Sequence, residues 1–194
     1  MPVWAIMSPV HHQPDGAAFD LVLLAHVACV VVGLVAMVTA AATAASLRRV
    51  LRVRAAIPDP VARYFRPGVN WTGRSVWGIP VFGFALLAMS QGAYDVNTGW
   101  VMGGVALFVL VAGLAEGVLW PAERRVQAAV AHAVASGGTS ESAAQAEAPF
   151  PPTPDSDVAP GIETVAGDVT LMVRVGVVAS VLLLVGTVLM VAQP

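Results

Sequence analysis

The chain has 194 residues, of which 57% are hydrophobic and only 11% are charged, and its mean hydropathy is +0.77. Soluble domains carry about 25% charged residues, so this composition excludes an ordinary water-soluble globule and predicts an all-α, polytopic membrane protein. The formal net charge is −2, and every basic residue is an arginine. The single cysteine, Cys29, excludes an intramolecular disulfide and an iron–sulfur cluster.

Four segments are apolar and long enough to cross about 30 Å of hydrocarbon as helices. They are residues 21–47, 76–93, 100–120 and 169–192. Pro80 lies one turn into the second segment, where its missing N–H and its ring predict a kink. Trp100 and Trp120 bound the third segment, at the places where an aromatic belt meets the two interfaces. We therefore predict a compact bundle of four transmembrane helices.

The arginines predict how this bundle is oriented. Seven lie in the loop at residues 48–75, between the first two spans: Arg48, Arg49, Arg52, Arg54, Arg63, Arg66 and Arg74. The other three, Arg124, Arg125 and Arg174, lie at the corresponding ends of the later spans. By the positive-inside rule this side is cytoplasmic, which places both termini outside a bacterial plasma (inner) membrane. We expect the seven loop arginines to bind anionic lipid head groups, and we expect no nucleic acid at the membrane plane.

The spans divide the chain into four regions. Residues 1–18 form a tail on the outer face, and residues 19–135 hold the first three spans, with a helical extension at 121–135. Residues 136–167 form an acidic loop rich in Pro and Ser, which we predict to be disordered, and residues 168–194 hold the fourth span. The tail lacks a basic start and a long apolar stretch, so no cleaved signal peptide is expected.

Two charged residues fall within the spans. Glu116 lies four residues before Trp120, and Arg174 lies six residues after Asp168, so both are expected at a similar depth near the inner interface. Because a charge in hydrocarbon normally faces a partner or a wet cavity, we predict an ion pair between Glu116 and Arg174. The alternative is that Glu116 is the coupling site of a small transporter.

Histidine and cysteine define a second candidate. His26 and Cys29 share one face of the first span, which favours a hydrogen bond from His26 to a neighbouring helix. Haem or copper ligation is the alternative, since imidazole and thiolate are both metal ligands. A weaker metal set lies in the outer tail, at His11, His12 and Asp15. The sequence predicts no cofactor with either set.

Small residues mark faces suited to close helix contact. Gly99 and Gly103, and then Gly113 and Gly117, form two small-xxx-small pairs on the third span. Ala36, Ala40 and Ala44 follow the same spacing on the first span, and single glycines stand at positions 33, 78, 83, 176 and 186. Such faces predict tightly packed helices with little room for a central pore.

Several short motifs resemble those of one family. They are Leu23-Leu24-Ala25-His26, the loop YFRPGVNW at residues 64–71, Pro80 with Gly83, and the exit WPAERR at residues 120–125. Over residues 21–125 the chain resembles a family of small four-helix bacterial integral membrane proteins of unknown function, which implies the four-helix layout. The layout is also similar to that of small copper-resistance membrane proteins, but the additional histidines that carry metal in those proteins are missing here.

These patterns favour a non-enzymatic role. No Walker lysine, G-x-S-x-G or H-E-x-x-H motif occurs, and few polar groups are available for a transport path. We therefore expect an accessory or scaffold subunit of a larger inner-membrane assembly, for example a respiratory complex, with other membrane proteins and the lipid bilayer as partners. The alternatives are the haem or copper protein that uses His26 and the transporter that uses Glu116.

Overall fold

The computed structural model describes residues 16–90, 97–144 and 165–192, and these residues form helices without strands. The elements in chain order are α1 (Ala17–Arg52), α2 (Asp59–Tyr64), α3 (Trp71–Arg74), η2 (Ser75–Trp77), α4 (Gly78–Met89), α5 (Gly99–Leu114), η3 (Ala115–Leu119), α6 (Trp120–Ala144) and α8 (Ala166–Ala192). Four helical stretches are long and apolar enough to cross a membrane: Ala17–Arg52, Trp71–Met89, Gly99–Ala135 and Ala166–Ala192. This confirms the all-α class and the four candidate spans.

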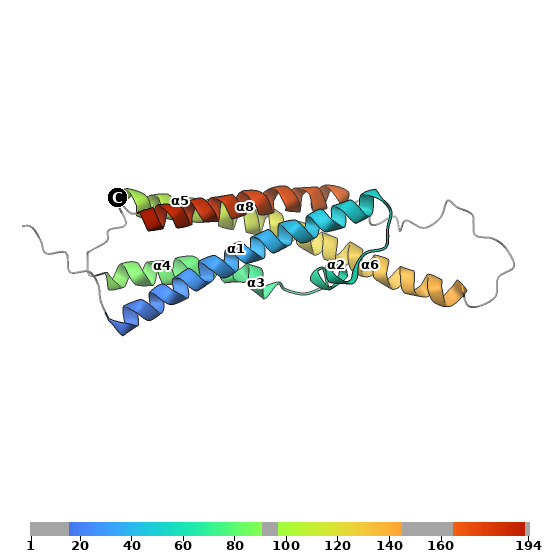
Figure 1. Ribbon diagram of the computed structural model, residues 1–194, viewed down its shortest axis with the longest axis horizontal. Helices are drawn as coiled ribbons and strands as arrows, with labels where there is room; N and C mark the ends of the chain where they lie inside the picture. Colours follow the sequence, from blue (N-terminus) through green and yellow to red (C-terminus); the bar gives the residue numbers. More distant parts are fainter. Residues whose placement is uncertain (1–15, 91–96, 145–164, 193–194) are drawn as a thin grey trace, which may run out of the picture.

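The helix boundaries differ from the sequence-based ones at the end of the third span. α6 continues to Ala144, although the predicted extension ended at residue 135. Figure 1 shows α6 projecting past the other helices at one end of the molecule. Of the segment predicted to be disordered, residues 145–164 lie outside the described residues, as do residues 1–15 of the tail.

Two prolines explain two irregular turns. Pro80 cannot donate a backbone hydrogen bond to the carbonyl four residues earlier, and the chain tightens into the 3₁₀ turn η2 just before α4. Pro121 has the same defect at the start of α6, and the π-helical turn η3 precedes it, with the Trp120 N–H donating to the Ala115 carbonyl. Next to Pro80 the helical pitch therefore changes locally. The turn η3, which precedes Pro121, is wider than an α-helical turn and contains Glu116.

α1 runs diagonally across the bundle and packs on both α4 and α8 (Figure 1). The crossing with α8 is very close, because a Cβ added at Gly176 would lie 2.9 Å from the Cβ of Ala41 and 3.3 Å from the carbonyl oxygen of Met37. Three alanines spaced four residues apart on the first span, Ala36, Ala40 and Ala44, are buried. Close packing through small residues therefore holds α1 in place, as the sequence predicted for this span.

The small residues of the third span behave differently. A Cβ added at Gly99, Gly103, Gly113 or Gly117 would meet nothing within 4 Å. These glycines therefore make no close helix contact within the described chain. They leave a flat outward surface on α5 and η3.

We call the end where α1 finishes and α8 begins the arginine-rich end. α1 finishes there with hydrogen bonds from the N–H of Ala55 to the carbonyl of Val50 (3.2 Å) and from the N–H of Arg54 to that of Leu51 (3.4 Å). Arg54 adopts a left-handed conformation with φ 49°, which completes this Schellman-type end and reverses the chain. The following loop then folds back so that Phe65 is fully buried in the main core.

Candidate functional site

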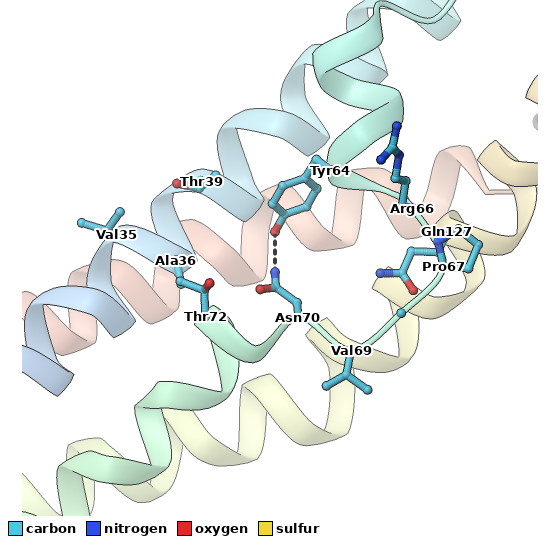
Figure 2. Close-up of a pocket in the computed structure, with 11 residues that line it drawn as sticks. Val35, Ala36, Thr39, Tyr64, Arg66, Pro67, Val69, Asn70, Thr72 and Gln127 are labelled. Atoms are coloured by element: carbon cyan, nitrogen blue, oxygen red, sulfur yellow. Dashed lines mark hydrogen bonds between the residues drawn. The ribbon is translucent and has the colours of Figure 1, made fainter.

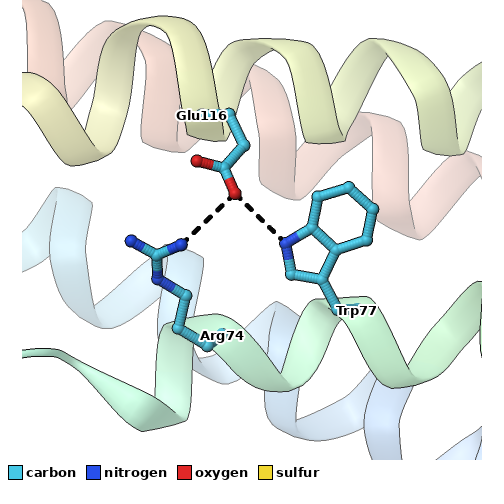
Figure 3. Close-up of polar contacts among 3 residues, drawn as sticks. All are labelled: Arg74, Trp77 and Glu116. Atoms are coloured by element: carbon cyan, nitrogen blue, oxygen red, sulfur yellow. Dashed lines mark hydrogen bonds and ion pairs between the residues drawn. The ribbon is translucent and has the colours of Figure 1, made fainter.

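Glu116 lies in a polar cluster formed with the start of the second span, beside the middle of α1, where Val76 packs on Gly33. Its Oε1 accepts hydrogen bonds from Arg74 Nη1 at 3.2 Å and from Trp77 Nε1 at 3.3 Å (Figure 3). The other carboxylate oxygen, Oε2, accepts no hydrogen bond from any residue that the structure describes. Glu116 therefore keeps one acceptor available on the outer surface of the bundle.

This arrangement corrects the expected pair of Glu116 with Arg174. Within the described ranges, the ion-pair partner of Glu116 is Arg74, and no contact joins it to Arg174. Arg174 is exposed on α8, between the buried Met172 and Val175, so its side chain leaves the bundle. The sequence argument matched the depth of the two residues but had no information about which way each helix face turns.

Arg74 has a structural role that the sequence did not predict. Its guanidinium carbon lies 3.8 Å from the ring centroid of Trp120, in addition to its ion pair with Glu116. Its side chain is 31% exposed. Arg74 thus ties the start of the second span to the end of the third, and its guanidinium contacts both Glu116 and Trp120.

Asn70 connects the loop to α6. Its Nδ2 donates to Tyr64 Oη at 3.3 Å (Figure 2) and to Glu123 Oε1 at 3.4 Å. Its Oδ1 accepts from the backbone N–H of Gly73 at 3.2 Å, which makes Asn70 the N-cap of α3. One amide side chain therefore fixes α2, α3 and α6 relative to one another.

A cavity of about 480 Å³ adjoins this network. Polar side chains line it from the loop and from α6, namely Tyr64, Arg66, Asn70 and Gln127, while Val35 and Ala36 of α1 form an apolar wall (Figure 2). Glu116 does not line this cavity. The cavity and the Glu116 cluster are thus separate features.

The remaining arginines divide into clamped and exposed groups. Arg125 makes a bidentate pair with Asp168, at 2.8 Å from Nε and 2.7 Å from Nη2, which clamps α6 to α8. Of the arginines predicted to meet lipid, Arg49, Arg52, Arg54, Arg63 and Arg66 are exposed and Arg48 is half-buried. Their binding of lipid head groups stays a prediction.

His26 and Cys29 both face α4. A Cβ added at Gly83 would lie 3.2 Å from Cε1 of His26, and one at Gly78 would overlap the sulfur of Cys29. His26 is 6% exposed, and its Nδ1 has no hydrogen-bond partner among the described residues. The two side chains fill the notches that these glycines leave in α4.

The described residues contain no cluster of metal-binding side chains. No three side chains among His, Cys, Asp and Glu gather there in a way that could hold an ion. His11, His12 and Asp15 lie outside the described residues. The predicted outer set is therefore not placed by the structure.

Comparison with known proteins adds no identification. No family model, no curated protein and no solved structure matches this chain significantly. The family resemblance of the loop and exit motifs therefore stays an expectation. The function is therefore inferred from the geometry of the chain itself.

Sequence reasoning missed three residues of this region. Asn70 and Glu123 belong to the hydrogen-bond network and Gln127 lines the cavity, yet none was a candidate, because polar residues beside a membrane span are ordinarily solvated. One signal was available: asparagine is a favoured N-cap, and Asn70 immediately precedes the helical turn at Trp71. The burial of Glu123 and Gln127 depends on the loop folding back over α6.

Proposed function

We propose that this chain is a non-enzymatic accessory subunit that docks on a larger assembly in the bacterial plasma membrane. The docking surface is the Glu116 face, defined here as Gly113, Glu116 and Gly117 together with Arg74 and Trp77. The occupant we propose is a transmembrane helix of another membrane protein that carries a hydrogen-bond donor. The observation that carries the proposal is the free Oε2 of Glu116 on this outward face.

The exposure of the ion pair supports a covering partner. The side chain of Glu116 is 46% exposed and belongs to a candidate membrane span. Charged groups in or near hydrocarbon are costly and normally face a protein partner or water. A partner helix over the Glu116 face would remove the pair from lipid and supply a donor to Oε2.

The shape of the face supports a helix as the partner. Gly117 is the fourth residue after Gly113, and a Cβ added at either glycine would meet nothing within 4 Å. A surface of this kind lets another helix backbone approach closely, which is the usual way in which membrane helices associate. The acceptor on Glu116 would then fix the register of the docked helix.

The two rival functions receive less support from the geometry. His26 and Cys29 lie in the contact between α1 and α4, which is the environment expected of side chains that join helices. Glu116 lies outside the lining of the cavity, and a coupling carboxylate would need a water-filled path. Neither site offers an observation that favours redox chemistry or transport over docking.

The test is purification of the tagged full chain from its native membrane in mild detergent. We expect a stoichiometric partner that is lost with Gly117→Leu and weakened with Glu116→Gln. Gly103→Leu is the matched control, because Gly103 is also open but lies more than three turns away on the same span. A chain that purifies alone, or a partner that both leucine variants retain equally, would contradict the proposal. A homodimer lost with Gly117→Leu would also contradict it, since the face would then bind a second copy.

A further inference from the structure

An amide without a protein partner opens into the cavity beside the loop. Gln127 is only 7% exposed, lines the cavity, and makes no hydrogen bond with any described residue. Its amide atoms stay accessible from the cavity, so whatever occupies the cavity supplies their hydrogen bonds. In Figure 2 the Gln127 side chain lies across the cavity from Asn70.

A second donor faces the same space. Tyr64 Oη accepts a hydrogen bond from Asn70 Nδ2, which leaves the phenolic hydrogen free to donate. Burial and the nearby Glu123 carboxylate raise the pKa of Tyr64 well above its usual range. The phenol therefore stays protonated at any physiological pH and remains a donor.

The charge of the lining favours an anion. Arg66 is the charged residue of the lining, and no carboxylate is part of it. Glu123 lies behind Asn70, and its negative charge is offset by the nearby Arg74 and Arg124. A ligand in the cavity would therefore meet one positive charge, the Gln127 amide and a hydroxyl donor.

We propose that this cavity binds a phosphate group, held by Arg66, Gln127 and Tyr64. A phosphate offers several strong acceptor oxygens, and arginine binds it with charge-assisted hydrogen bonds. The phosphate belongs either to a phospholipid head group or to a soluble phosphate compound. The apolar wall of Val35 and Ala36 would accommodate the glycerol end of a lipid, and the cavity also admits free phosphate.

The experiment has two arms, both with the full-length protein. In the first, the protein is placed in nanodiscs and released for native mass spectrometry, with phosphatidylglycerol compared with diacylglycerol, which lacks phosphate. In the second, inorganic phosphate is titrated into the detergent-solubilised protein by calorimetry. Binding in the first arm assigns a lipid source, and binding in the second assigns a soluble one.

Two arginine variants separate a defined site from general surface charge. Arg66→Gln removes the positive charge from the cavity lining. Arg63→Gln removes a positive charge from the exposed side of the same loop, where Nη2 of Arg63 lies 3.9 Å from Oδ2 of Asp59. We expect Arg66→Gln to weaken binding about tenfold or more, and Arg63→Gln to change it less than about twofold. Gln127→Leu should also weaken binding about tenfold.

Equal losses with the two arginine variants would overturn the proposal, because binding would then be general electrostatic attraction. The absence of phosphate-dependent binding in both arms would also overturn it. If Gln127→Leu fails to fold by size-exclusion chromatography, Tyr64→Phe tests the same site with little change in packing. Wild-type affinity in Tyr64→Phe and Arg66→Gln together would reject the assignment.

Discussion

At the scale of single residues, Asn70 shows how much one side chain can do where the loop meets α6. It caps α3, supports the phenol of Tyr64 and satisfies the buried carboxylate of Glu123. Those three roles need an amide, because they require one acceptor and two donor hydrogens, and a hydroxyl has only one hydrogen to donate. The sequence could have predicted the cap, but the contact with Glu123 crosses 53 residues and depends on the folded loop.

Replacing Asn70 with aspartate tests this network. Asn70→Asp keeps the cap but sets a carboxylate against Glu123, so the free energy of unfolding should fall by about 2 kcal/mol or more. The double variant Asn70→Asp with Glu123→Gln should recover most of that loss, since the glutamine amide can donate to the new carboxylate. The measurement is denaturant unfolding in mild micelles followed by circular dichroism. A double variant no more stable than Asn70→Asp would show that Asn70 and Glu123 are not coupled.

The ion pair of Glu116 illustrates the limit of sequence reasoning at this scale. Glu116, Arg74 and Arg174 are all expected near the same interface from their distance to the ends of their spans. Depth along a helix follows from counting residues, whereas the direction of a side chain around the helix depends on packing and on irregular turns such as η3. Counting residues therefore predicts a depth along each span, but it does not predict the partner.

At the scale of elements, α1 and α8 cross in close contact. Gly176 of α8 fits against Ala41 and the backbone of Met37, with no space for a methyl group. Gly186 of the same helix has room, since an added Cβ would lie 3.8 Å from Leu107, an ordinary contact distance. Two glycines of one helix thus face opposite packing environments.

Alanine substitutions at these two glycines should have opposite effects. Gly176→Ala forces the backbones of α1 and α8 apart, and we expect it to lower the free energy of unfolding by about 1–3 kcal/mol. Gly186→Ala should be neutral or stabilising by up to about 1 kcal/mol, because alanine favours the helix. Thermal unfolding of both purified variants in one detergent checks the difference. Equal stabilities would mean that α1 and α8 do not pack as described.

At the scale of the whole molecule, the four spans were predictable because hydropathy reports a property that each segment carries alone. The burial of Phe65 was not predictable. This residue lies in the loop, outside the four predicted spans, and is fully buried. The loop contributes to the core only after it has folded back, so no local pattern in the sequence reveals it.

The arginines predict the orientation in the membrane, and labelling can test this prediction. In a Cys29→Ala background, Val53→Cys lies at the arginine-rich end, where Val53 is 72% exposed, and Gly99→Cys lies at the opposite end of the bundle. We expect a membrane-impermeant maleimide to label Gly99→Cys in intact spheroplasts, and Val53→Cys only after permeabilisation. The reverse pattern would place the arginines outside.

The π turn at Ala115–Leu119 has a consequence for how this chain can vary in length. A π turn holds in effect one residue more than the α-helical turn it replaces, and each residue of an α-helix advances the face by about 100°. Deleting one residue there would therefore turn the π turn into a regular α-helical turn and leave the phase of α6 relative to α5 nearly unchanged. Val126 would stay in the core, and Arg125 would keep its pair with Asp168. A single deletion in the regular part of α5 would instead rotate every residue beyond it by about 100°, so Ala115–Leu119 is the part of this helix that can lose one residue without losing its packing.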